Sequence, residues 1–173
     1  MSQVFTFRVV PDIEETVFRD IEILEHDTFE NLHKSIQDAF SFDGSQMASF
    51  YMSNDDWDKG QEITLMKMDF DDGSSSLEMN DTPLNALITD EGDKMVYVFD
   101  FMLMWCFFIE VVSIKNSEGK EYPVCSNSFG KAPDQYSKEI DLSDEDDKYL
   151  LKNKGKTDED DFDEEFEELP SDI

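Results

Sequence analysis

The segment from Asp27 to Phe40 constrains the fold most, because it joins a helix start signal to a helical repeat of apolar residues. Asp27 or Thr28 is suited to accept hydrogen bonds from the free backbone N–H groups of a first turn. Glu30, three residues after Asp27, completes a capping-box pattern. Apolar residues at helical spacing then share one face: Phe29, Leu32, Ile36 and Phe40. The sequence therefore predicts one amphipathic helix with a buried stripe.

The polar residues of the helix are expected on or toward its other face: His33, Lys34, Gln37 and Asp38. Upstream, residues 17–23 alternate between apolar and polar after Phe18, as a strand with one buried side does. Phe18 breaks the alternation, which indicates that this end of the strand is covered on both faces.

Further strands are predicted over residues 3–10, 47–52, 62–68, 94–101 and 105–114, with an edge segment at 122–124. A short helix is expected from Asp81, because Pro83 lies in its first turn, where the missing N–H costs nothing. This order predicts an α+β protein, a β-grasp-like mixed sheet packed on one main helix. The additions to it are the extra short helix, a C-terminal antiparallel hairpin and a disordered acidic tail.

The charge of the chain is extreme, with 43 acidic and 14 basic residues among 173 and a formal net charge of −29. Such a balance argues against direct nucleic-acid or anionic-membrane binding, because phosphate contacts need Lys and Arg. It fits a basic protein partner, a DNA-mimicking surface or a simply soluble protein. Residues 95–114 are mostly apolar, but Asp100 and Glu110 would each cost about 2.5–3.5 kcal/mol at mid-bilayer. We therefore expect a cytoplasmic protein without a membrane span.

The chain divides by composition into a single α+β domain, residues 1–136, and an acidic tail, residues 137–173. Repulsion between its carboxylates should keep the free tail disordered. Three apolar residues recur within the tail at helical spacing and are candidate partner-binding residues: Phe162, Phe166 and Leu169. With counter-charge, this part of the tail is suited to form a short helix in the groove of a basic partner.

Two motifs resemble the plasmid pRiA4b ORF-3-like family. The first is Leu32-His33-x-x-Ile36-Gln37-x-Ala39-Phe40-x-Phe42-Asp43, followed by Phe50, and the second is Tyr97-x-Phe99-Asp100-Phe101 with Trp105. The similarity covers roughly residues 4–136 and includes Cys125 and the run Gly130-Lys131-Ala132-Pro133. It implies a fold and a link to mobile elements, because relatives of the family occur among passenger proteins of insertion elements.

The chain departs from the family pattern at the residues most suited to a metal or acid/base site. Met102 and Leu103 stand where family members carry a Gly and a second Asp before the Trp, and Gln46 and Ala48 stand where they often carry histidines. Either the family function never depended on those residues, or this branch has lost it. We expect no catalytic residues, no metal and no cofactor.

Few single residues are candidates for chemistry. His33 lacks neighbours at metal-ligand spacing and is expected to have a structural role or to lie at the surface. Asp100 is expected to cap a turn or to pair with Arg8 or Arg19, rather than to act as a carboxylate with a raised pKa. The acidic run at 69–73 lacks EF-hand spacing, because its Gly arrives one residue early.

The run from Met102 to Phe108 is apolar throughout and is expected to be core, with a dimer interface as the alternative. Monomer and homodimer both stay open. The functional hypothesis is a non-enzymatic protein-interaction module that acts through an acidic surface and tail. The alternatives are an accessory or degenerate enzyme of nucleic-acid processing, and a DNA mimic that inhibits a nucleic-acid-binding protein.

Overall fold

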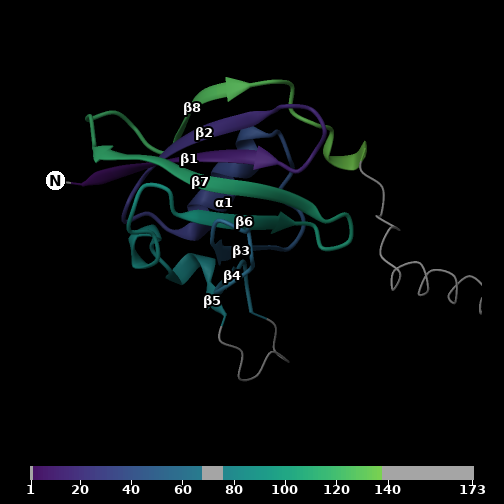
Figure 1. Ribbon diagram of the computed structural model, residues 1–173, viewed down its shortest axis with the longest axis horizontal. Helices are drawn as coiled ribbons and strands as arrows, with labels where there is room; N and C mark the ends of the chain where they lie inside the picture. Colours follow the sequence, from purple (N-terminus) through teal and green to yellow (C-terminus); the bar gives the residue numbers. More distant parts are fainter. Residues whose placement is uncertain (1, 68–75, 138–173) are drawn as a thin grey trace, which may run out of the picture. The chain divides into compact units, whose positions relative to one another are not determined.

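A computed structural model describes residues 2–67 and 76–137, and these form a mixed α+β unit (Figure 1). The strands are β1 (Gln3–Pro11), β2 (Phe18–Leu24), β3 (Ala48–Ser53), β4 (Glu62–Thr64), β5 (Leu77–Glu78), β6 (Lys94–Phe99), β7 (Trp105–Asn116) and β8 (Val124–Phe129). The helix α1 spans Phe29–Ala39, and short 3₁₀ turns cover Met79–Asp81, Leu84–Ala86 and Gln135–Ser137. The predicted α+β class with one main helix is confirmed for this part of the chain.

The strands form one sheet in the order β5-β4-β3-β6-β7-β1-β2-β8. Neighbouring strands are antiparallel except β4 and β5, which are parallel and make the sheet mixed. β1 lies between β2 and β7, and the predicted hairpin of β6 and β7 contains the second sequence motif. The short β4 and β5 form one end of the sheet, and β8 forms the other (Figure 1).

The predicted apolar stripe of α1 is confirmed, because all four of its residues are at most 1 % exposed. It packs against one face of the sheet in an aromatic-rich core. Phe29 meets Phe50 on β3 with ring centroids 5.3 Å apart, and Phe40 meets Phe107 on β7 at 5.1 Å. This packing fixes α1 against the middle strands, and it thereby sets which helical residues face the space beside it.

The start of α1 differs from the predicted capping box. Thr28 is the N-cap, and its hydroxyl accepts the N–H of Asn31. The Asp27 carboxylate accepts the backbone N–H of Thr28 and the side-chain amide of Asn31. With Thr28 as N-cap, the third helical residue is Asn31 and not Glu30, so Glu30 does not close the box. Its side chain is instead available to the space beside the helix.

Several element predictions need correction. The fourth strand ends at Thr64, so residues 65–67 are not strand, and the two-residue β5 was not predicted. The edge strand β8 covers Val124–Phe129 rather than 122–124, and the short helix expected from Asp81 is replaced by the two 3₁₀ turns Met79–Asp81 and Leu84–Ala86. The run at 102–108 is only partly core: Trp105 and Phe107 are buried, but Met102 is 70 % exposed and Met104 is 42 % exposed. The reason is a tight turn between β6 and β7, in which Asp100 and Met104 both adopt positive φ.

Asp100 caps this turn as one of the two expected alternatives, because its Oδ1 accepts the N–H groups of Met102 and Leu103 at 3.1 Å. The two arginines have other partners. Arg8 binds both carboxylate oxygens of Asp20 at 2.9 Å. Arg19 donates to the carbonyl oxygens of Phe18, Ala39 and Phe129. It thereby links β2, the end of α1 and β8.

The described residues belong to one compact unit. None of the helices in residues 2–67 and 76–137 is long and apolar enough to cross a membrane. The acidic run at 69–73 and the candidate tail residues Phe162, Phe166 and Leu169 lie outside the described residues. The boundary between domain and tail, and the behaviour of the tail, therefore stay predictions.

Candidate functional site

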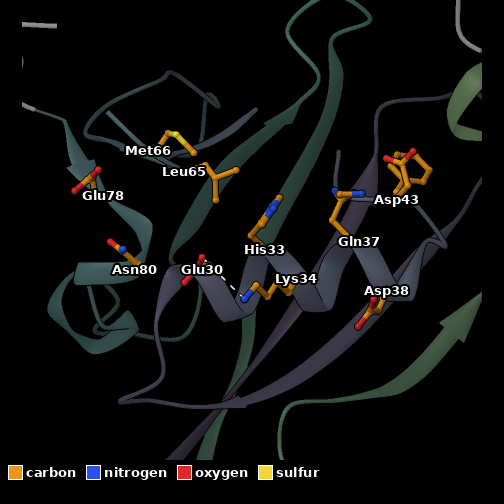
Figure 2. A pocket seen from close by; sticks show the side chains of 12 residues that line it. Glu30, His33, Lys34, Gln37, Asp38, Asp43, Leu65, Met66, Glu78 and Asn80 are labelled. Carbon is orange, nitrogen blue, oxygen red and sulfur yellow. Dashed lines mark hydrogen bonds and ion pairs between the residues drawn. The ribbon is translucent and has the colours of Figure 1, made fainter. Parts of the chain in front are cut away.

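A pocket of about 510 Å³ lies along the polar side of α1. We call it the α1 pocket. Its lining comes from α1 and from three segments that the fold brings beside it: Glu30, His33, Lys34, Gln37, Asp38, Phe42, Asp43, Gly44, Leu65, Met66, Glu78 and Asn80. The segment after β4 provides Leu65 and Met66 across from the helix, as Figure 2 shows. The pocket thus combines an apolar wall with a polar helical side.

His33 and Gln37 are buried at the inner side of this pocket, each 4 % exposed. Both side chains were expected on or toward the face opposite the apolar stripe, and the structure buries them instead. For His33, a structural role was one of the two expected alternatives. The reason for their burial is Tyr97 in the middle of β6, a fully buried tyrosine whose hydroxyl both side chains contact. His33 Nδ1 lies 2.6 Å from that hydroxyl oxygen, and Gln37 Nε2 lies 2.9 Å from it. A buried phenol hydroxyl needs such partners.

The hydrogen bonds of this group determine the tautomer of His33. The backbone N–H of Gly44 donates to Gln37 Oε1 at 2.9 Å, so the amide nitrogen of Gln37 donates to the Tyr97 oxygen. The Tyr97 oxygen thus accepts from Gln37, and the remaining contact of this hydroxyl among residues 2–67 and 76–137 is His33 Nδ1. The Tyr97 O–H therefore donates to His33 Nδ1. In a neutral imidazole one nitrogen accepts and the other carries the proton. We therefore assign the proton of His33 to Nε2.

Both titratable groups of this network are neutral near pH 7. Burial, together with the charge of neighbouring Lys34, lowers the pKa of His33 to about 4. Burial also raises the pKa of Tyr97 well above its ordinary value, against a smaller opposite effect of the Gln37 hydrogen bond. Nε2 of His33 has no hydrogen-bond partner among residues 2–67 and 76–137, and the ring points from α1 into the α1 pocket (Figure 2). The network therefore presents a fixed N–H donor to the pocket.

Acidic side chains line the pocket on both sides of this donor. Figure 2 shows Glu30, Glu78 and Asn80 on one side of His33, and Gln37 and Asp43 on the other. With Asp38, the lining holds four carboxylates and one basic side chain, Lys34. Lys34 is 4.0 Å from a Glu30 oxygen and its side chain is 64 % exposed, so it neutralises Glu30 only weakly. The side chains that line the pocket therefore carry a net negative charge.

The carboxylates differ in how far the protein already uses them. Asp43 accepts hydrogen bonds from Tyr136, Ser45 and Gln135, and these bonds hold its pKa well below the ordinary value. Among residues 2–67 and 76–137, the one hydrogen bond to the Glu78 carboxylate comes from the backbone N–H of Lys67. Glu30 and Glu78 therefore retain acceptor capacity for a ligand. The Asp43 carboxylate is instead used in hydrogen bonds that hold the segment around Gln135.

The residues that the family comparison singled out are not gathered in the α1 pocket. Gln46 and Met102 are exposed, Ala48 is buried in the core, and Leu103 packs partly against the core. Among residues 2–67 and 76–137, no group of three or more His, Cys, Asp or Glu side chains is arranged to hold a metal ion. The site that the fold does assemble lies instead around His33 and Gln37 of the first motif.

A family model described as plasmid pRiA4b ORF-3-like protein matches residues 3–165. The chain belongs to this family. The pRiA4b ORF-3-like match includes the α1 segment, β6 and the loop segments that line the α1 pocket. It confirms the resemblance seen in the two sequence motifs.

A solved structure shares the fold of this pRiA4b ORF-3-like chain. It is the crystal structure of a protein of unknown function from Methanosarcina mazei Go1, with a TM-score of 0.68 and 20 % sequence identity. The similarity covers 94 % of this chain and 86 % of that chain. The search among curated proteins found no match. The comparisons thus show the family and the fold of this chain but no function. The candidate functional site is the α1 pocket, which the fold itself assembles.

Sequence reasoning missed the pocket although part of its signal was present. His33 and Gln37 are four residues apart and stand beside the apolar stripe, at the edge where a helix meets its sheet. Two polar residues with this spacing, each able to donate and accept, are suited to share one buried partner. What the sequence could not supply was the partner, because Tyr97 follows His33 by 64 residues.

Proposed function

We propose that this protein is a non-enzymatic protein-interaction module whose α1 pocket binds a Lys or Arg side chain of a basic partner. The observation that carries the proposal is the lining of that pocket, four carboxylates against one weakly paired lysine. Clustered carboxylates in a cleft focus a negative potential on the space between them. A cationic side chain entering the pocket gains from this potential.

The apolar wall supports the same type of ligand. Leu65 and Met66 lie across from α1, and Met66 is 53 % exposed. Lysine and arginine carry a methylene stem below their charged tip, and such stems pack along apolar surface while the tip stays among polar groups. The combination of an apolar wall and carboxylates at one end, Glu30 and Glu78, suits this shape.

His33 supports binding over proton transfer. With its pKa at about 4 and Nδ1 occupied by the Tyr97 hydroxyl, the ring near pH 7 offers an N–H donor and lacks a free basic nitrogen. A general base must instead present an unprotonated atom to its substrate. We therefore assign the pocket to recognition. The cytoplasmic location, the link to mobile elements and the β-grasp-like classification stay predictions from the sequence.

A titration with a lysine- and arginine-rich peptide tests the proposal, with an uncharged glutamine-substituted peptide as reference. The pocket variant is Glu30→Gln combined with Glu78→Gln, and the matched control is Asp12→Asn with Glu14→Gln, two exposed carboxylates at the β1–β2 turn. Both variants remove two charges. We expect the pocket variant to weaken peptide binding several-fold more than the control, measured by calorimetry at physiological salt. Equal losses would assign the binding to net charge alone and refute the pocket.

A further inference from the structure

We infer that the α1 pocket recognises a main-chain carbonyl of its basic ligand as well as the cation, through the Nε2–H of His33. This inference rests on the proposed function and names the ligand class more closely. The ligand is a peptide segment in which the charged tip of Lys or Arg meets Glu30 and Glu78 while a peptide carbonyl accepts from His33. The pocket thereby distinguishes a peptide from a simple amine.

The unpartnered donor is the first reason. His33 is only 4 % exposed, and its Nε2–H faces the pocket without a partner in residues 2–67 and 76–137. Buried polar groups are nearly always hydrogen-bonded, and leaving one unsatisfied is costly. A ligand that enters this pocket and excludes water must therefore supply an acceptor at Nε2, or binding is weakened.

The surrounding charge decides which acceptor fits. Glu30, Asp38, Asp43 and Glu78 all line the same space, so a phosphate or carboxylate acceptor would be repelled. A neutral oxygen avoids this repulsion. The carbonyl oxygen of a peptide is such an acceptor, and in a basic peptide every cationic side chain is attached to a main chain that carries one.

The donor is also held in place before any ligand arrives. The chain of hydrogen bonds from Gly44 through Gln37 and Tyr97 fixes both the tautomer and the orientation of His33. Gly44 has φ +66°, a left-handed conformation that favours glycine, and this conformation places its N–H toward Gln37. A preorganised donor costs little entropy on binding. The network thus serves recognition rather than stability alone.

Two probes separate the carbonyl from the cation. Nα-acetyl-arginine N-methylamide carries both groups, whereas n-butylguanidine carries the same guanidinium, a four-carbon stem and the same single positive charge without an amide. We expect the full-length protein to bind the acetylated amide about 2- to 12-fold more tightly than n-butylguanidine, the range that one hydrogen bond supplies. The measurement is an NMR titration followed on the ring nitrogens of His33, whose ¹⁵N spectrum also reports the Nε2–H tautomer.

Two substitutions separate the two edges of the imidazole. Asparagine places its oxygen near the position of Nδ1, so His33→Asn keeps an acceptor for Tyr97 and removes the donor to the pocket. Glutamine reaches the position of Nε2, so His33→Gln keeps an N–H donor there. We expect His33→Asn to bind both probes equally and His33→Gln to retain the preference for the amide.

The outcomes distinguish this inference from the proposed function. Equal binding of both probes by the unmodified protein overturns the carbonyl contact and leaves the cation pocket intact. Failure of both probes and of the basic peptide overturns the pocket itself, and failure of both probes alone overturns only the carbonyl contact. If His33→Asn does not fold, the comparison of the two probes on the unmodified protein decides the question.

Discussion

The Tyr97 hydroxyl and His33 Nδ1 lie 2.6 Å apart and join the middle of β6 to the polar side of α1. This contact has two effects. It satisfies a fully buried phenol, and it directs the proton of His33 to the α1 pocket. The stability of the fold and the proposed recognition therefore depend on the same pair of residues.

Replacing Tyr97 by Phe should destabilise the fold by about 1–3 kcal/mol, because His33 and Gln37 would each lose a buried hydrogen-bond partner. Urea unfolding measures the loss. The control is Tyr51→Phe, which removes a partly exposed hydroxyl 3.4 Å from Glu62 and should cost much less. The ¹⁵N spectrum of His33 should then lose its single Nε2–H tautomer. Retention of full stability would show that the network is not a structural unit.

The stability of the protein should fall as the pH is lowered from about 6.5 to about 4, in part through His33. Burial lowers the pKa of His33 from 6.5 to about 4, so the unfolded chain binds this proton more readily than the folded chain within that window. The contribution is about 1.4 kcal/mol per pH unit, fully retained above pH 6.5 and lost toward pH 4. The slope should decrease in His33→Asn. It should persist in the control His26→Asn, whose histidine is exposed.

Arg19→Lys should loosen the β8 edge of the sheet. Arg19 is 7 % exposed and donates to carbonyl oxygens on three segments, including Phe129 at 3.0 Å and Ala39 at 3.2 Å. A lysine ammonium lacks the planar fork that reaches them together. We expect a loss of about 1.5–3 kcal/mol and faster amide exchange in β8. Arg8→Lys, at a more exposed side chain, should leave β8 exchange unchanged; equal exchange in both variants would contradict the assignment.

Removing residues 157–173 should weaken binding to a basic protein partner without unfolding the domain, if the tail contributes as the sequence predicts. The control is a full-length chain in which Phe162, Phe166 and Leu169 are replaced by Ser, which keeps every carboxylate. A loss in both variants assigns the effect to apolar anchoring, and a loss only on deletion assigns it to charge. Unchanged binding in both variants would end the docking role of the tail.

The sequence predicted the features that depend on local periodicity. Phe29, Leu32, Ile36 and Phe40 follow the helical repeat, so their burial could be predicted from spacing alone. Alternation likewise located β1 and β2, whereas β4 is shorter than predicted and most of β8 was not predicted. The two-residue β5 is too short for any periodic signal, and it depends on parallel pairing with β4.

The candidate site depended on contacts between distant residues, and these could not be predicted from spacing. Gln37 and His33 look like solvent-facing polar residues until Tyr97 is placed beneath them. For Met102 and Met104 the error was the reverse, because these apolar side chains were expected in the core and are exposed. The turn at 100–104, with positive φ at both ends, directs them outward. In both cases the tertiary environment decided burial, not the chemistry of the residue.

The two tryptophans of the chain lie on opposite faces of the sheet, because Trp105 is the first residue of β7 and Trp57 packs on Phe108, three residues further along the same strand. Trp105 is buried against Phe42 on the helix side and donates its indole N–H to the carbonyl oxygen of Gln135, whereas Trp57 packs on Phe108. Their fluorescence should therefore differ in emission maximum and in access to quenchers. Two variants that each keep one tryptophan would therefore report on different parts of the fold. The fluorescence of Trp105 would follow the aromatic core, and that of Trp57 would follow the opposite face of the sheet.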